Sequence, residues 1–311
     1  MRLLLALESA RDQEYQLDYH YSVQGFIYNM LRGSSFEHLH DRDGYKFFCF
    51  SNIFPYSSMM KKGDRRNLLI SSPSADLIMH IDRRVRAHRH AGDVIGIGDM
   101  RFLLKGSKMI HYPLSMKQFT LVTATPIVVR IARDKYSRFN IRPRHDYEYL
   151  YWRKDHPLDL FIEQLEDNLF KKYKEYTGLD IEDEVMAELE DDGSSDGNGD
   201  GKCNIGNGTV EMSKSSSSSK KGRKGVKEYS ASGHLINRLR FIKQVAKEIS
   251  MHGNRHIVIG TLWTFWFNIE NYNRCDAILK LLQFALDAGF GERNSLGFGF
   301  MNIIHRPLIP E

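Results

Sequence analysis

The chain has 311 residues, which is long enough for two domains, because single domains commonly run to about 100–200 residues. Its 44 Lys and Arg residues against 39 Asp and Glu give a formal net charge of +5, a balance that permits a nucleic-acid partner without arguing for one. Three cysteines without a CxxC pair argue against a zinc site and indicate a reduced cytoplasmic protein. No run approaches the ~20 apolar residues of a membrane helix, and the short apolar start is expected to be a strand rather than a signal peptide.

The first third of the chain predicts a β-α-β-β-α-β order of elements. Strands are expected at residues 2–8, 46–51, 68–71 and about 101–112, and helices at 20–32 and from 73 onward. The first helix is indicated by apolar residues at helical spacing and by Gly33 at its end. Ser72 and Pro73 predict the cap and the first position of the second helix, and Ser34 with Glu37 resembles a capping box. This order is typical of the ferredoxin-like fold.

A second and looser copy of the same order follows. Its strands are expected at 119–131, 235–249, 255–268 and 296–304, and its helices at about 155–177 and 273–288. Gly289 is expected to end the last helix. The sequence therefore predicts an α+β protein of two tandem ferredoxin-like domains, the first at 1–115 and the second at 116–311.

One segment of the second domain has a composition that does not favour a packed core. Eight of the thirteen residues from Asp180 to Asp192 are acidic, and a stretch rich in glycine, serine and lysine follows. Such a composition buries too little apolar surface to offset chain entropy, so residues 186–229 are predicted to be a disordered insertion. Its basic half, from Lys220 to Lys227, either contacts nucleic-acid phosphates or neutralises the acidic half.

A candidate catalytic corner lies between the first helix and the second strand. The sequence HLHDRDGYK places His40 six residues before Lys46, and Tyr28 lies on the preceding helix. A ribonuclease that uses no metal needs a group with a pKa near neutrality to move protons, a cation for the charge on the phosphate, and a means of holding that phosphate. These three side chains supply those residue types, although a capping His and a strand-edge Lys are also ordinary structural features.

The other histidines do not suggest a metal site. His88 and His90 are two residues apart, so on a helix they point to different faces. Their run RRVRAHRH reads either as a basic stripe or as a solvated helix face. The sequence has no HExxH motif, no carboxylate cluster typical of a two-metal nuclease and no Walker GK[ST] sequence. Neither a metal nor a cofactor is expected.

The stretch GFGERNSLGFG, at residues 289–299, is rich in glycine and aromatic residues. Its four glycines are Gly289, Gly291, Gly297 and Gly299. Because glycine has no side chain, it lets backbone amides approach a bulky or charged ligand, and phosphate is the usual candidate. The alternative is a hairpin-like turn that leads into the last strand.

The tandem layout and the terminal GFGERNSLGFG resemble the Cas6 family of CRISPR repeat-RNA endoribonucleases. The sequences QGFIYNML, LHDRDGYKFFCFS and TPIVV extend this resemblance over most of the chain outside the 180–229 insertion. The resemblance implies a metal-independent enzyme that cleaves the repeats of a CRISPR transcript for antiviral defence. In that reaction the 2′-OH attacks the adjacent phosphate, which gives a 2′,3′-cyclic phosphate and a 5′-OH.

By motif alignment, the catalytic Tyr, His and Lys of the family fall on Tyr28, His40 and Lys46. His38 is a rival to His40, since it lies two residues away and is able to serve if the register of the turn differs. The resemblance also places the glycine-rich loop on the RNA-facing surface between the domains. There Arg293 is expected to add a charge-assisted contact to a phosphate.

Further RNA contacts are expected from Arg142 and Arg144, because basic and aromatic residues alternate through 132–156. The alternative for that segment is an edge strand with a charged outer face. Phe290 and Phe298 are expected either to stack on bases or to pack in the core.

Two other functions remain open at this point. Some members of the family lack the histidine and bind RNA without cutting it, so the chain is alternatively a non-cleaving relative or a CRISPR effector subunit. A tandem ferredoxin-like protein with a small-molecule or structural role is the third hypothesis. The expected partner is CRISPR repeat RNA, with effector-complex proteins and a second copy of the chain as further candidates, in the cytoplasm and without a membrane partner.

Overall fold

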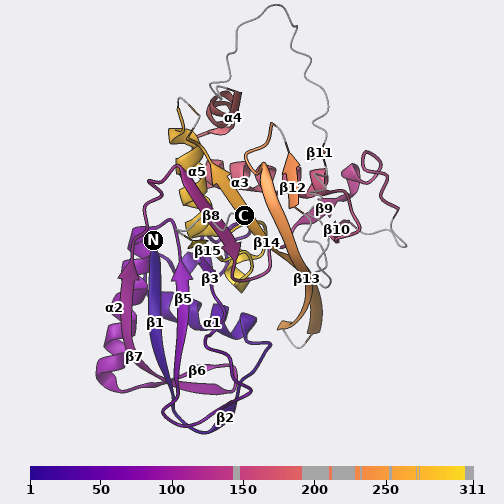
Figure 1. Cartoon of the computed structure of the whole chain (residues 1–311). Coiled ribbons are helices and arrows are strands. Elements are labelled where there is room, and N and C mark those ends of the chain that lie inside the picture. The colour runs from indigo at the N-terminus through magenta and orange to yellow at the C-terminus, as the bar shows by residue number, and fades with distance from the viewer. Residues whose placement is uncertain are drawn as a thin grey trace, which may run out of the picture.

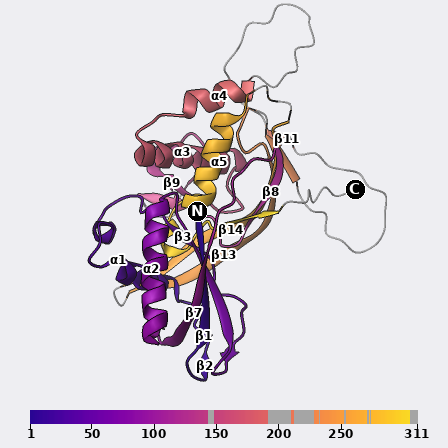
Figure 2. The same cartoon turned by 90° about the vertical axis from the view of Figure 1, so that its left-hand side faces the viewer.

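The computed structural model describes residues 1–142, 148–190, 210–211, 228–231, 233–251, 254–270, 272 and 274–304. Figure 1 shows two units, each with its own sheet, and the first unit carries the N-terminal strand. Figure 2 shows the helices α3, α4 and α5 gathered in the second unit. Segment 111–117 connects the last strand of the first unit to the first strand of the second.

The first unit has the predicted order with three short additional strands. Its elements are β1 (Arg2–Ser9), β2 (Gln13–Glu14), α1 (His20–Leu31), a 3-10 turn η1 (Glu37–Leu39), β3 (Cys49–Phe50), β4 (Met59–Met60), β5 (Arg65–Ser71), α2 (Ala75–Ala91), β6 (Val94–Ile97) and β7 (Met100–Ile110). The antiparallel sheet has the order β3-β5-β1-β7-β6. Alternate residues of β1, among them Leu3 and Leu5, are buried in one cluster with the apolar faces of α1 and α2. That pattern is expected of a sheet with helices on one face.

The second unit repeats this arrangement. Its elements are β8 (Gln118–Thr123), β9 (Arg130–Ala132), η2 (Arg133–Lys135), β10 (Tyr149–Tyr151), α3 (Leu158–Thr177), α4 (Glu182–Glu190), β11 (Val210–Glu211), β12 (Glu228–Ala231), β13 (Arg238–Met251), β14 (Asn254–Asn268), α5 (Asp276–Ala288), η3 (Asn294–Leu296) and β15 (Met301–Ile304). The main sheet has the order β11-β12-β13-β14-β8-β15. Both sheets thus place the first strand of the unit between the third and the fourth, as the ferredoxin-like pattern requires, and the predicted α+β class is confirmed.

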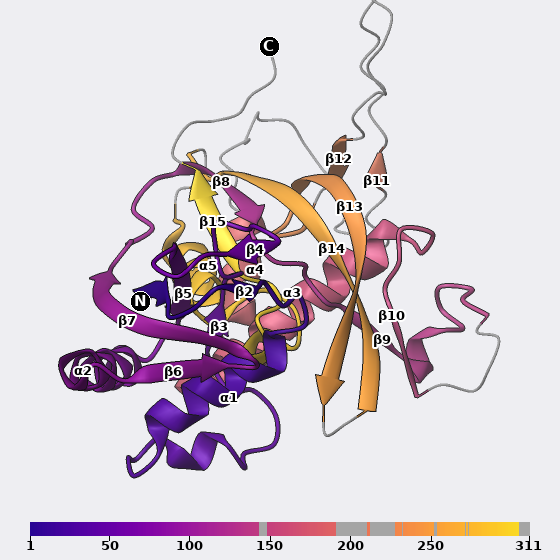
Figure 3. The ribbon, with the colours of Figure 1, turned by 90° about the horizontal axis from the view of Figure 1, so that it is seen from below.

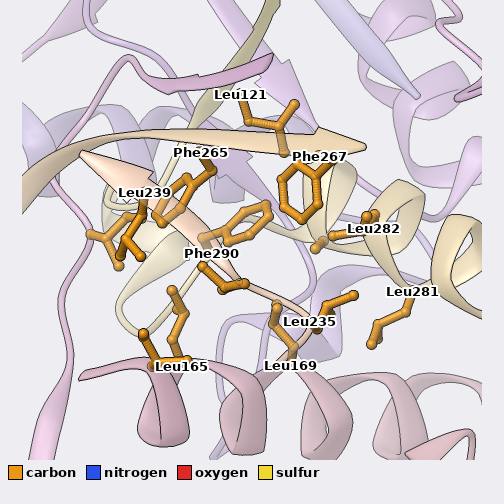
Figure 4. Packing of buried hydrophobic residues seen from close by; sticks show 14 of the residues in the cluster. Leu121, Leu165, Leu169, Leu235, Leu239, Phe265, Phe267, Leu281, Leu282 and Phe290 are labelled. Atoms are coloured by element: carbon orange, nitrogen blue, oxygen red, sulfur yellow. The ribbon is translucent and has the colours of Figure 1, made fainter. Parts of the chain in front are cut away.

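The core of the second unit lies between its sheet and the helices α3 and α5. Figure 4 shows Phe265 of β14 and Leu239 of β13 facing Leu165 and Leu169 of α3, with Phe290 between them. The β13–β14 hairpin also extends beside α1 of the first unit (Figure 3). The two units therefore share contacts along more than the connecting segment.

Two element boundaries in the first unit differ from the prediction. The strand expected at 46–51 is limited to Cys49–Phe50, because Phe47 has a φ of 53° and interrupts the extended conformation. Ser72 does not cap α2. The N-cap is Ser74, whose Oγ accepts a hydrogen bond from the amide of Leu77 at 3.2 Å, whereas the Oγ of Ser72 accepts from the amide of Ser74.

The start of the predicted insertion is wrong by several residues. Residues 186–190 belong to helix α4, and the Glu188 carboxylate accepts hydrogen bonds from the amides of Ala277 and Ile278 at 3.0 and 2.9 Å. The first amides of a helix have no intrahelical partner, so Glu188 stabilises the beginning of α5. Strand β11 and the first two residues of β12 also fall inside the 186–229 range, and the rest of that range lies outside the described residues.

The glycine-rich loop, residues 289–299, joins α5 to β15 and packs between the two units. All four glycines have positive φ, between 64° and 89°. A Cβ at Gly297 would lie 2.3 Å from the ring of Phe50 in β3, and one at Gly299 would lie 1.9 Å from the carbonyl oxygen of Phe290. Close packing within the protein therefore requires glycine here, as well as the backbone conformation.

In the described part of the chain, the helices are too short or too polar to cross a membrane. Cys49 and Cys275 are buried free thiols, and Cys203 lies outside the described residues.

Replacing Gly299 by alanine is expected to lower the free energy of unfolding by about 2–4 kcal/mol, from the positive φ and the contact with Phe290 together. Gly106→Ala in β7 is the matched control, because nothing lies within 4 Å of a Cβ added there. Urea unfolding followed by circular dichroism measures both variants. Equal stability of the two would show that the loop does not need glycine for packing.

Candidate functional site

Tyr28 lies on α1 with its ring against that of His40. The ring centroids are 5.0 Å apart with the planes at 70°, and the Tyr28 ring also meets Phe48 edge-on at 5.9 Å. Burial raises the pKa of Tyr28 to about 12, so its hydroxyl keeps its proton at neutral pH. Tyr28 can therefore donate a hydrogen bond or a proton in this corner.

His40 is exposed and is oriented by its neighbour. Its backbone amide donates to the carbonyl of Glu37 at 3.0 Å, at the end of η1. Its Nδ1 lies 2.5 Å from the carboxylate of Asp41, which accepts the Nδ1 proton. A carboxylate on one imidazole nitrogen fixes the tautomer and leaves Nε2 for other chemistry. His40 and Tyr28 line the same cavity, of 360 Å³.

Lys46 lies behind the same turn. Its ammonium donates to the carbonyl oxygen of His40 at 3.3 Å and to that of Arg42, and partial burial lowers the pKa of Lys46. It borders a different cavity, of 260 Å³, which it shares with His38. The Nδ1 of His38 lies 2.7 Å from the carbonyl oxygen of Ser35. All three candidate catalytic residues therefore meet at one corner, but Lys46 is on the side of His38 and not on the side of Tyr28.

The backbone amides of the glycine-rich loop were expected to approach a phosphate, but those of three of its glycines form hydrogen bonds within the protein. The backbone amides of Gly289, Gly297 and Gly299 donate to carbonyl oxygens of the protein at 2.8 Å, so they are not available to a phosphate. Phe290 and Phe298 are fully buried and pack in the core, which excludes base stacking by either ring in this conformation. RNA binding by the loop stays a prediction, but these glycines serve packing within the protein.

Arg293 is a half-buried residue at the turn of the loop. It adopts a left-handed conformation with a φ of 58°, which is uncommon for a residue with a side chain. It borders two cavities, one of 60 Å³ that also contacts Lys46 and one of 790 Å³. Among the described residues, its buried Nε has no hydrogen-bond partner. A buried donor without a partner is costly, so this guanidinium is suited to an anionic ligand.

The 790 Å³ cavity is a groove of mixed polarity between the units. It is bordered by Tyr45 of the first unit, by Arg130, Asn168 and Lys171 of the second, and by the loop. Arg142 is exposed in the segment between η2 and β10. Arg144 lies outside the described residues, so the expected footprint around 142–144 stays a prediction.

Two groups that hold the loop were missed from the sequence. Arg130 in β9 forms an ion pair with Glu292 and lies over the ring of Tyr149 at 4.6 Å. Lys172 in α3 is fully buried, and its ammonium donates to Gly289, Gly291 and Asn294 of the loop. The signal for Lys172 was present, since it continues the apolar stripe of α3 one turn after Leu169.

In the described residues, no three His, Cys, Asp or Glu side chains are grouped so that they could hold a metal ion.

Relatives of the chain are known. Residues 112–303 match the family described as "CRISPR associated protein Cas6, C-terminal". The "CRISPR-associated endoribonuclease Cas6" of Haloferax mediterranei is 28% identical over 98% of this chain and 94% of its own length. "CRISPR-associated endoribonuclease Cas6 2" of Methanocaldococcus jannaschii is also 28% identical, over 98% of this chain and all of its own.

A solved structure described as "An RAMP protein binding different RNA substrates" has a similar fold. It superposes with a TM-score of 0.60 at 19% identity, over 98% of this chain and all of that one. The family match spans more than half of the chain and includes the glycine-rich loop. The chain therefore belongs to the Cas6 family.

Proposed function

We propose that this protein is an endoribonuclease that cleaves CRISPR precursor RNA within its repeats, without a metal ion. The observation that carries the proposal is the pairing of Tyr28 with His40, whose Nδ1 is held by Asp41. The two curated relatives are named as Cas6 endoribonucleases and match almost the whole chain. In this proposal residues 1–115 form the domain that carries the catalytic corner, and 116–311 form the domain that carries the glycine-rich loop.

The reaction needs one proton removed and one proton supplied. The ribose 2′ oxygen loses its proton and forms a bond to the adjacent phosphorus, while the bond from phosphorus to the 5′ oxygen breaks and that oxygen takes a proton. The products are a 2′,3′-cyclic phosphate and a 5′-OH. Imidazole suits either transfer, because its ordinary pKa is near 6.5. Tyr28 holds its proton and can hydrogen-bond a phosphate oxygen, and Lys46 supplies positive charge.

Repeat RNA is the partner in this proposal. Of the three cations among the described residues that border the groove between the units, Arg130 is paired with Glu292 and Lys171 with Asp167. The proposal therefore assigns the phosphate contact to Arg293, with Tyr45 and Tyr149 as the aromatic rings that border the groove. Cations with aromatic rings are typical of single-strand binding. CRISPR effector proteins, a second copy of the chain and a cytoplasmic location stay predictions.

A non-cleaving RNA-binding protein is the second candidate, and one observation favours it. Lys46 and His40 border different cavities, so an RNA that reaches His40 does not meet the ammonium in its present position. Cleavage requires Lys46 to leave the carbonyls of His40 and Arg42. Catalytic hydrogen bonds are often long in a free enzyme and tighten only with substrate.

His40→Ala is expected to slow cleavage of repeat RNA by about 10²–10⁴-fold, the usual contribution of a general acid or base, with RNA binding retained. The assay is run in EDTA and includes an RNA with a single 2′-deoxy nucleotide at the cut site. His38→Ala is the matched control and should cleave normally.

The outcomes of that assay separate the candidates. Loss of cleavage in His38→Ala rather than in His40→Ala would move the catalytic role to the rival histidine. Cleavage abolished by EDTA, or cleavage of the 2′-deoxy RNA, would exclude the proposed reaction. Tight binding by the wild type without any cleavage would establish the non-cleaving alternative.

Arg293→Ala is expected to weaken repeat-RNA binding and to reduce the slope of log Kd against log salt by about 0.7–1, the value for one phosphate contact. Arg274→Ala is the control. That exposed arginine precedes the first residue of α5, whereas the glycine-rich loop follows the last one. Filter binding over a salt series measures both. A slope that matches the wild type in Arg293→Ala would rule out the phosphate contact.

A further inference from the structure

Lys172 is a buried cation whose hydrogen bonds all go to the glycine-rich loop. It lies on α3 with 1% of its side chain exposed. Its Nζ donates to the carbonyl oxygens of Gly289 and Gly291 at 2.5 and 3.0 Å, and to the side-chain oxygen of Asn294 at 3.1 Å. An ammonium has three donors and no acceptor. The three loop oxygens therefore match its protonated form.

Asn294, which accepts a hydrogen bond from Lys172, also bonds to the loop on either side of itself. Its Nδ2 donates to the carbonyl oxygen of Phe290 at 3.0 Å and to that of Phe298 at 2.9 Å. Lys172 and Asn294 thus bind backbone carbonyls before and after the turn that contains Arg293. That turn holds Arg293 in its left-handed conformation, and the carbonyl oxygen of Arg293 accepts from the amides of Leu296 and Phe298.

Stability of the fold alone does not account for a lysine at this position. Taking an ammonium out of water is costly, and an apolar side chain of similar volume is often as stable or more stable in such a site. Glu292, the carboxylate whose charge raises the pKa of Lys172, is already paired with Arg130. A polar group retained in a core at such a cost is better explained by what it holds in place.

We propose that Lys172 is a positioning residue, whose ammonium fixes the 289–299 loop in the one conformation that presents Arg293 to the RNA. The part of this inference that concerns RNA rests on the proposed function. The part that concerns the loop applies to the free protein.

The protonation of Lys172 gives the proposal a signature of its own. Burial lowers the pKa of Lys172 to about 7. The ionisable groups that face it are Cys49 of β3, Glu292 and Arg293 of the loop, and Tyr45 and Lys46 across the 60 Å³ cavity. A neutral amine has two N–H donors, so deprotonation leaves one loop oxygen without a donor.

Loop order and global stability should then respond to pH in opposite directions. In the unfolded chain the lysine keeps its ordinary pKa of 10.5, against about 7 when folded. Between these values the unfolded state binds more protons, so this group makes the fold more stable as pH rises. Over the same range the loop loses a hydrogen bond, and binding that depends on the loop should weaken.

The test compares Lys172→Met with Lys174→Met, which replaces an exposed lysine of the same helix. Binding of repeat RNA that carries 2′-deoxy at the cut site is measured at about pH 6 and about pH 8.5, either side of the shifted lysine pKa. Lys172→Met is expected to bind about tenfold to a hundredfold more weakly at the lower pH, the size expected for lost hydrogen bonds to a charged group. Its affinity should also depend less on pH than that of the wild type, while Lys174→Met behaves as the wild type.

Hydrogen exchange of the free proteins provides the second readout. The amides of Phe290, Glu292 and Leu296 donate within the protein and should exchange faster in Lys172→Met, with the amides of β1 unchanged. If Lys172→Met does not fold, Asn294→Ala takes its place, since it cuts the same network within the loop. Wild-type exchange and affinity in these variants would overturn the proposal. Absence of RNA binding by the wild type would instead refute the proposed function, and loop exchange would still decide the role of Lys172.

Discussion

Residues 289–299 lie where both units of the protein meet, and their backbone is packed too closely for side chains at the glycine positions. The Nδ1 of His20, in the first unit, lies 2.8 Å from the carbonyl oxygen of Leu296. The His20 ring also stacks on the ring of Phe298, with the ring centroids 5.2 Å apart. Cys49 donates its thiol proton to the carbonyl oxygen of Phe298 at 3.2 Å. Burial lowers the pKa of His20 to about 4, so it remains a neutral partner at ordinary pH.

This junction links the loop to the candidate catalytic corner through a single helix. Helix α1 begins at His20, which contacts the loop, and carries Tyr28 two turns later, where it contacts His40. A hydrogen-bonded helix transmits a change of position along its axis without much internal deformation. Under the proposed function, helix α1 therefore fixes the distance between the place where Arg293 holds the RNA and the place where the RNA is cleaved beside His40.

The sequence could predict the features of the fold and of the site that depend on residues close in sequence, but not those that depend on contacts between distant residues. The order of strands and helices followed from periodicity, and the meeting of Tyr28 with His40 followed from their place around one helix end. The truncation of β3 at Phe47 and the packing of Gly297 on Phe50 arise from contacts distant in sequence. From the sequence, the glycines are therefore expected either to approach a phosphate or to form a turn, and their close contacts with other parts of the protein do not show. Lys172 was missed because a lysine is expected to be exposed to solvent, and the loop oxygens that accept its hydrogen bonds are distant in sequence.

The position of Lys46 bears on both candidate functions. Its ammonium is held by the carbonyls of the same turn that presents His40, so moving it toward a phosphate also releases that turn. A phosphate is the stronger acceptor, because it adds the attraction between opposite charges to a hydrogen bond that a neutral carbonyl makes without it. In an active enzyme, substrate binding would then complete the corner and free His40 in one step. In a non-cleaving relative, the Lys46 ammonium would stay hydrogen-bonded to the same two carbonyls, and its role would be only to stabilise the turn.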